Sequence, residues 1–83
     1  MRVDKYLKVS RLIKRRTVAN EAASLGRVGL NGKEAKPSSE VKEGDVLSLR
    51  LGGKTLTVRI DSVQETARKA DASDMYTVLE DVK

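Results

Sequence analysis

The sequence predicts an α+β domain in which two short N-terminal helices pack on a small antiparallel sheet of about four to five strands. Three observations lead to this prediction. Apolar residues recur at helical spacing up to residue 25, alternate with polar residues beyond residue 27, and are separated there by tight-turn dipeptides. The 83 residues are expected to form a single domain, 1–83, with a motif core over about 2–51 and C-terminal strands over about 54–80.

The first helix is expected from Asp4 to about Ser10. Val3, Leu7 and Ser10 share one helix face, with Tyr6 beside them as a further core residue. Asp4 stands in the first turn, where a carboxylate complements the positive end of the helix dipole.

The second helix is expected to begin near residues 15–17, with Thr17 as its N-terminal cap. Its predicted apolar stripe consists of Val18, Ala22 and Leu25, widened by two neighbouring alanines. Gly26 is expected to stop the helix in a left-handed conformation.

The strands follow from turn signals and alternation. Asn31-Gly32 predicts a hairpin with a short return strand over 34–36, and residues 37–45 read as a polar loop. Alternation over 46–51 and again at 56–60, on either side of Gly52-Gly53, predicts a second hairpin. Residues 64–74 read as a loop or frayed helical turn, 75–79 as the last strand, and 81–83 as a tail.

Positive charge gathers in the N-terminal part of the chain. Residues 1–36 contain ten basic and three acidic residues, whereas residues 37–83 contain seven basic and nine acidic ones. This asymmetry indicates a polyanionic partner that meets one face of the molecule. The candidate RNA contacts are Arg2, Lys5, Lys8, Arg11, Lys14, Arg15, Arg16, Arg27, Lys33 and Lys36.

Two groups carry this interpretation. Arg2, Lys5 and Lys8 repeat every three residues along one side of the first helix. Arg15 and Arg16 stand where the second helix begins, and the free backbone N–H groups of a helix start favour an anion. The alternative is that all of these are ordinary solvated charges.

The Asn31-Gly32 dipeptide forms a hairpin turn in any protein, so it need not carry function. It also brings Lys33, with Arg27 and Lys36 nearby in sequence, toward a surface where RNA would dock. Both readings stay open at this point.

Catalysis has few residues to work with, because the chain contains no His and no Cys. The spacing of Glu40, Glu43 and Asp45 does not match a calcium-binding loop, and a solvated turn explains them better. The sequence therefore predicts a protein that is not an enzyme, with no catalytic residues, no metal site and no cofactor.

Two tyrosines are the only aromatic residues, so base stacking cannot be the main mode of binding. Structured RNA is the expected partner. Because no apolar run is long enough for a membrane span or a signal peptide, a cytoplasmic protein without membrane contact is expected.

Several segments resemble the S4 RNA-binding domain. They are Arg2-Val3-Asp4-Lys5-Tyr6-Leu7, Arg16 with Ala19, the run from Gly26 to Lys33, and Gly44-Asp45. Arg15 departs from that pattern, since many members carry a Ser cap there. Within that family, the run from Lys8 to Thr17 and Met75-Tyr76-Thr77 are similar to the stand-alone heat-shock protein 15 family, in particular to its short bacterial members.

This resemblance implies a specific role. Such proteins bind the large ribosomal subunit obstructed by peptidyl-tRNA, contact ribosomal RNA and the tRNA, and hold the tRNA in the P site during ribosome-associated quality control. The short members support a partner factor that adds C-terminal alanine tails. Carried onto this chain, the resemblance implies Arg2, Lys5, Arg15 and Arg16 as main RNA contacts, supported by Arg11, Lys14 and Lys33, in a monomer.

Two other functions remain in view. One is a ribosome assembly or structural RNA-binding factor. The other is a protein-interaction module that uses an exposed sheet edge over 75–79. DNA binding is disfavoured, because the alanine-rich face of the second helix is expected to be buried instead of entering a groove.

Overall fold

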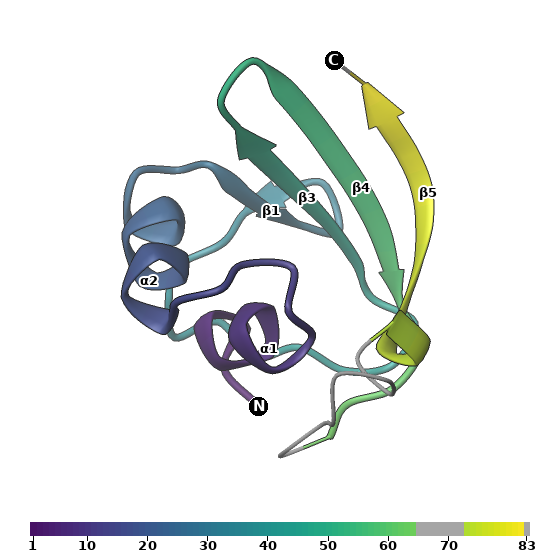
Figure 1. The fold of residues 1–83 in the computed structure, drawn as a ribbon. Coiled ribbons are helices and arrows are strands. Elements are labelled where there is room, and N and C mark those ends of the chain that lie inside the picture. The colour runs from purple at the N-terminus through teal and green to yellow at the C-terminus, as the bar shows by residue number, and fades with distance from the viewer. Residues whose placement is uncertain (65–72, 83) are drawn as a thin grey trace.

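The computed structural model describes residues 1–64 and 73–82, and in it two helices lie on one side of a five-stranded antiparallel sheet (Figure 1). The strand order is β2-β1-β3-β4-β5. The elements are α1 (Val3–Val9), α2 (Arg16–Ser24), β1 (Val28–Leu30), β2 (Lys33–Glu34), β3 (Val46–Leu51), β4 (Lys54–Ile60), the 3-10 helix η1 (Ser73–Met75) and β5 (Tyr76–Val82). The predicted fold class is confirmed.

Helix α1 buries the face that the sequence predicts. Val3, Tyr6 and Leu7 are fully buried, and Ser10 caps the helix end. The loop over 37–40 closes the other end, because the backbone N–H of Val3 donates to the carbonyl of Ser39 at 2.7 Å. The helix start is thereby satisfied from within the chain.

Helix α2 buries only part of the predicted stripe. Ala19, Ala22 and Ala23 are buried, whereas Val18 is 44% and Leu25 58% exposed. The prediction is confirmed for the three alanines and wrong for Val18 and Leu25, because α2 packs closely against its neighbours and only small side chains fit at such a contact. The bulkier residues turn toward solvent.

Helix α2 begins at Arg16, within the predicted range, but its cap differs from the prediction. Arg15 occupies the N-cap position, no side chain makes a cap hydrogen bond there, and Thr17 lies inside the helix. At the other end, Gly26 adopts a φ of +75°, so the predicted left-handed stop is confirmed.

The first hairpin forms as predicted, with φ of +52° at Asn31 and +83° at Gly32. Its return strand is Lys33–Glu34 instead of 34–36. The predicted range is too late because the turn contains only two residues, which leaves Lys33 directly opposite Leu30.

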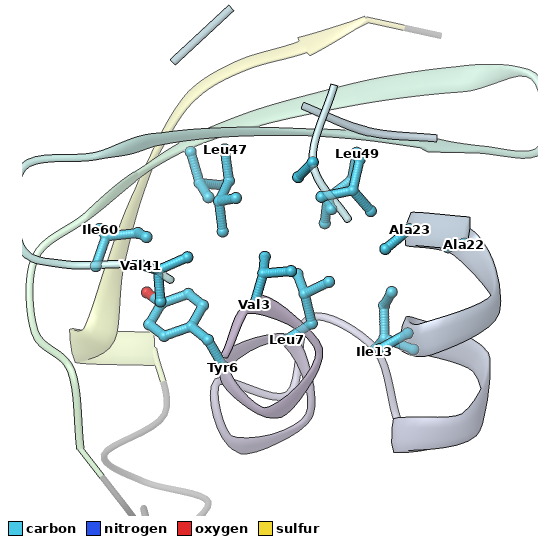
Figure 2. Packing of buried hydrophobic residues seen from close by; sticks show 14 of the residues in the cluster. Val3, Tyr6, Leu7, Ile13, Ala22, Ala23, Val41, Leu47, Leu49 and Ile60 are labelled. Atoms are coloured by element: carbon cyan, nitrogen blue, oxygen red, sulfur yellow. The ribbon is translucent and has the colours of Figure 1, made fainter. Parts of the chain in front are cut away.

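The core lies between the helices and the inner face of the sheet, where Leu47 and Leu49 of β3 and Ile60 of β4 face Val3, Tyr6 and Leu7 of α1 (Figure 2). Because successive residues of a strand point to opposite faces, the outer face carries polar residues such as Ser48 and Thr57.

The last strand is longer than predicted. β5 runs from Tyr76 to Val82, so residues 81 and 82, expected to be a tail, pair with Leu56 and Thr55 of β4. The seven-residue β4 offers partners along its whole length, and a register shift at Thr57/Val58 keeps the two strands paired. Of the predicted loop over 64–74, residues 65–72 lie outside the described residues.

Candidate nucleic-acid interface

A buried carboxylate joins the two helix starts. Asp4 is only 2% exposed, although it carries a charge. Its Oδ2 accepts a hydrogen bond from Nη2 of Arg2 at 3.1 Å and from Nδ2 of Asn20 at 3.3 Å. Its Oδ1 lies 3.4 Å from Nη2 of Arg16 and accepts the backbone N–H of Lys5 at 2.7 Å. Residues from both helices therefore converge on a single side chain.

The two arginines remain accessible in this arrangement. The side chains of Arg2 and Arg16 are each 47% exposed, so each guanidinium is held at one edge while other N–H groups face solvent. A guanidinium carries five donors in a planar fork, and each arginine presents Nη2 to Asp4. The remaining donors are accessible to an external anion.

A hollow of about 300 Å³ opens beside this group. It is lined by Asp4, Arg16, Thr17 and Asn20. Three of the lining residues belong to the first turns of α2, the uncapped helix start. An anion placed here would meet free backbone N–H groups as well as a guanidinium. The start of α1 offers no such place, because Ser39 and Pro37 already accept the N–H groups of Val3 and Asp4.

Most of the other predicted residues of this region are exposed. Lys8, Arg11, Lys14 and Arg15 face solvent, and none of them forms an ion pair with another described residue. Lys5 is half-buried. We call the set on α1, the connection and the start of α2 the helical basic surface: Arg2, Lys5, Lys8, Arg11, Lys14, Arg15 and Arg16.

Arg11 has an unusual backbone. It follows α1 with a φ of +63°, in the left-handed region that Gly and Asn favour. Its backbone N–H donates to the carbonyl of Lys8 at 3.1 Å, so it continues the end of the helix. The steric cost of a Cβ at this φ is thus taken at an exposed arginine.

The three predicted RNA contacts that follow α2 in sequence do not lie together in the structure. Lys36 is exposed at the beginning of the loop whose carbonyls receive the first N–H groups of α1, so it lies close to the helical basic surface. Arg27 and Lys33 instead line a second hollow together with β1 and β3. The structure thus does not gather all ten predicted residues on one surface.

Two residues near these places were missed by sequence reasoning. Asn20 lies one helical turn after Arg16, so its presence on the same face follows from the i, i+4 spacing. Arg50 lines the second hollow. Alternation in β3 places it on the outer face, but its closeness to Arg27 depends on the pairing of β1 with β3, which no local pattern indicates.

Two of the three acidic residues over 40–45, Glu40 and Asp45, are tied into the fold. Glu40 pairs with the N-terminal amine at 2.7 Å. Asp45 is 6% exposed and accepts hydrogen bonds from Nδ2 of Asn31 and the backbone N–H of Lys42. The expected solvated turn is thus wrong for Asp45, which ties the loop to the first hairpin. Within residues 1–64 and 73–82, no group of three or more Asp, Glu, His or Cys gathers closely enough to hold a metal ion.

Arg59 in β4, unlike most of the cations on the helices, is paired with an acidic residue. Arg59 donates from Nε to Oδ1 of Asp61 at 2.8 Å, and Thr77 donates to the same carboxylate. The hydrogen bonds from Thr77 and Arg59 lower the pKa of Asp61 below its usual value. Arg59 is therefore held by an acid, unlike most of the helical basic surface.

Comparison with known proteins identifies a domain family for the part of the chain that contains both helices. The family model of the S4 domain matches residues 1–47, which span α1, α2, β1, β2 and the beginning of β3. The fold and this match make the chain an S4-domain protein.

Relatives extend the similarity beyond that domain. The chain is 53% identical to the "RQC P-site tRNA stabilizing factor" of Bacillus subtilis, with all of this chain and 96% of the relative covered. It is 56% identical to the protein of the same name from Listeria innocua, over 98% of this chain and 88% of the relative. Heat shock protein 15 of Vibrio cholerae, described as a trimer, superposes with a TM-score of 0.87 at 34% identity, over 94% of this chain and 80% of the other. The chain belongs to the family of RQC P-site tRNA stabilizing factors.

None of the helices in the described part of the chain is long and apolar enough to cross a lipid bilayer.

Proposed function

We propose that this protein binds the large ribosomal subunit obstructed by peptidyl-tRNA, contacts ribosomal RNA and the tRNA, and stabilises the tRNA in the P site during ribosome-associated quality control. The names of its relatives support this role. The observation that carries it is the convergence of Arg2 and Arg16 on Asp4, beside an uncapped helix start.

The protein acts here by binding and not by chemistry. Cations of the helical basic surface neutralise RNA phosphates and release counterions, which lowers the free energy of the complex. Because phosphate contacts position a partner without reading its sequence, the surface suits a folded RNA recognised by shape. The protein catalyses no reaction in this proposal, functions in the cytoplasm as a monomer, and supports the factor that adds alanine tails.

The direct test replaces Arg16 with Ala and measures co-sedimentation with large subunits that carry peptidyl-tRNA. We expect roughly tenfold weaker binding, because a charge-assisted contact is lost. The plot of log affinity against log salt should also become less steep by about 0.7–0.9.

Lys54→Ala is the matched control. It removes one exposed positive charge at the start of β4, outside the group around Asp4, and should bind as the wild type does. Wild-type binding by Arg16→Ala at moderate salt would refute the assigned site. Accumulation of immature subunits, without obstructed ones, in cells that lack the protein would favour an assembly factor instead.

One observation favours a protein-interaction role in addition. β5 is an edge strand, and Val78 and Leu79 on it are 51% and 50% exposed. An open edge with exposed apolar residues can accept a strand from a partner. A partner protein that stays bound after all RNA is digested by nuclease would support this role.

A further inference from the structure

We propose that the protein has a second RNA-contact surface, on the outer face of the sheet, where Arg27 and Arg50 flank a hollow. We call it the sheet-face pocket. The inference rests on the proposed function, since it takes RNA as the partner. It assigns Arg27 to a place different from the helical basic surface and adds Arg50.

The backbone sets the positions of the two arginines. Arg27 lies directly before β1, and Arg50 lies in the neighbouring strand β3. The backbone N–H of Arg50 donates to the carbonyl of Arg27 at 2.9 Å. The two residues are therefore side by side although 23 positions separate them in sequence. Replacing either side chain leaves this backbone hydrogen bond in place.

Small residues leave room between the cations. The pocket has a volume of about 300 Å³, and Gly29 and Ser48, which are partners in the β1–β3 ladder, form part of its lining. A Cβ on Gly29 would lie 3.5 Å from the Cβ of Ser48, so the missing side chain is what keeps this space open. Since Leu47 and Leu49 point into the core, Ser48 and Arg50 point to the opposite face. Both helices lie on the other side of the sheet (Figure 1).

The charge of the pocket is positive and unpaired. Neither Arg27, Lys33 nor Arg50 forms an ion pair with another described residue, in contrast to Arg59 with Asp61. Among the described residues that line the pocket, Glu34 is the acidic one, and it stands opposite Gly29 in the β1–β2 ladder. Lys33 stands opposite Leu30, which packs on the core, so its backbone lines the pocket while its side chain lies on the other face. Two arginines against one carboxylate leave an excess of positive charge, which complements a phosphodiester backbone. No aromatic residue lines the pocket, so base stacking is not its mode of binding.

The sheet-face pocket is separate from the helical basic surface. Arg16 begins α2, and Arg27 follows its end. The nine residues of the helix set these ends about 14 Å apart at a rise of about 1.5 Å per residue. The guanidinium of Arg16 is turned toward Asp4 of α1, whereas Arg27 lines the pocket beside β1 and β3, so we expect a different RNA phosphate at each. A second phosphate contact here would fix the orientation of the protein on its RNA, which a single contact leaves free.

The test compares Arg50→Ala with the wild type in co-sedimentation with large subunits that carry peptidyl-tRNA. We expect about five- to tenfold weaker binding and a salt slope less steep by about 0.7–0.9. Lys42→Ala is the matched control, because it removes an exposed cation at the opposite end of β3. Glu34→Gln should have the opposite effect and bind RNA a few-fold more tightly, since it removes the negative charge of the one acidic residue in the described lining of the pocket.

Parallel measurement of Arg16→Ala separates the possible failures. Weaker binding by Arg16→Ala together with wild-type binding by Arg50→Ala would overturn the sheet-face pocket and leave the proposed function standing. Wild-type binding by both variants would overturn the proposed function as well. If Arg50→Ala fails to fold, Glu34→Gln decides, and binding by this variant that is unchanged or weaker contradicts the assignment.

Discussion

Oδ1 of Asp4 lies 3.4 Å from Nη2 of Arg16, so a buried carboxylate of the first helix fixes a guanidinium at the start of the second. Arg2 contacts the other oxygen of the same carboxylate. An acid in the middle of the proposed RNA surface lowers its total positive charge. It also holds two flexible side chains in one orientation before RNA arrives, which reduces the conformational entropy lost on binding.

Replacing Asp4 with Asn separates these two effects. The change raises the net charge by one, so an argument from charge alone expects tighter RNA binding. We expect weaker binding, because the arginines lose their common acceptor. We also expect a loss of about 2 kcal/mol in the free energy of unfolding, less than for a fully buried pair, since both arginines are half exposed.

Urea unfolding and RNA binding of the Asp4→Asn variant measure the two quantities. Glu43→Gln is its control, because it also removes one acidic charge, at an exposed position that forms no ion pair with another described residue. Binding by Asp4→Asn that equals or exceeds that of the wild type would show that the carboxylate does not position the arginines.

The second prediction concerns the buried face of α2. Ala19→Leu adds three carbon atoms to a fully buried position and should lower the free energy of unfolding by about 1–3 kcal/mol through overpacking. Val18→Ala, at a position 44% exposed, should change it by less than about 0.5 kcal/mol. Thermal unfolding monitored by circular dichroism compares the two variants, and the opposite order would contradict the packing of the helix.

This helix shows where the sequence is informative and where it is not. Periodicity predicts that α2 is amphipathic, but Val18 and Ala19 adjoin each other on the helix, and hydrophobicity alone favours the larger residue as the buried one. The distance between packed helices decides the question, and that distance is a tertiary property. The hairpins at Asn31-Gly32 and Gly52-Gly53 were predictable because turn chemistry is local.

The candidate site, too, could be predicted from the sequence only in part. The accumulation of cations between Arg2 and Arg16 is visible in the sequence. The sequence does not show that Asp4 is the common acceptor of Arg2 and Arg16, because this role depends on the approach of α1 to α2. Arg50 could not be found either, since only the pairing of β1 with β3 brings it to Arg27.

The third prediction concerns the left-handed Arg11. Arg11→Gly relieves the steric cost of a Cβ at positive φ, about 1–2 kcal/mol. It also increases the entropy of the unfolded chain, which offsets about 0.5–1 kcal/mol of that gain. We expect a net stabilisation of up to about 1 kcal/mol together with weaker RNA binding.

Unfolding and RNA binding of Arg11→Gly are compared with those of Arg11→Asn. Asn tolerates the left-handed region and also lacks the charge, so it should bind as weakly as the glycine variant. If both variants bind RNA as the wild type does, Arg11 is not part of the interface. If Arg11→Gly unfolds more easily than the wild type, the backbone at this position is not strained.

The last prediction links the core to pH. The hydroxyl of Tyr6 donates to the carbonyl of Met75 at 2.8 Å, and its burial, followed by the nearby charge of Asp61, raises the pKa of Tyr6 well above its ordinary value of 10.0. The folded protein thus holds this proton more tightly than the unfolded chain does. The stabilisation is complete below pH 10.0, the ordinary pKa, and is lost as the pH rises above it.

Tyr6→Phe removes this pH dependence. At neutral pH we expect a loss of only about 0.5–1 kcal/mol, because the backbone N–H groups of Asp61 and Ser62 still donate to the carbonyl of Met75. Above pH 10 the wild type should lose stability more steeply than the variant, as measured by urea unfolding at a series of pH values. Tyr76→Phe is the control, since Tyr76 is only partly buried. Parallel pH profiles for the wild type and Tyr6→Phe would show that the Tyr6 proton does not contribute to alkaline unfolding.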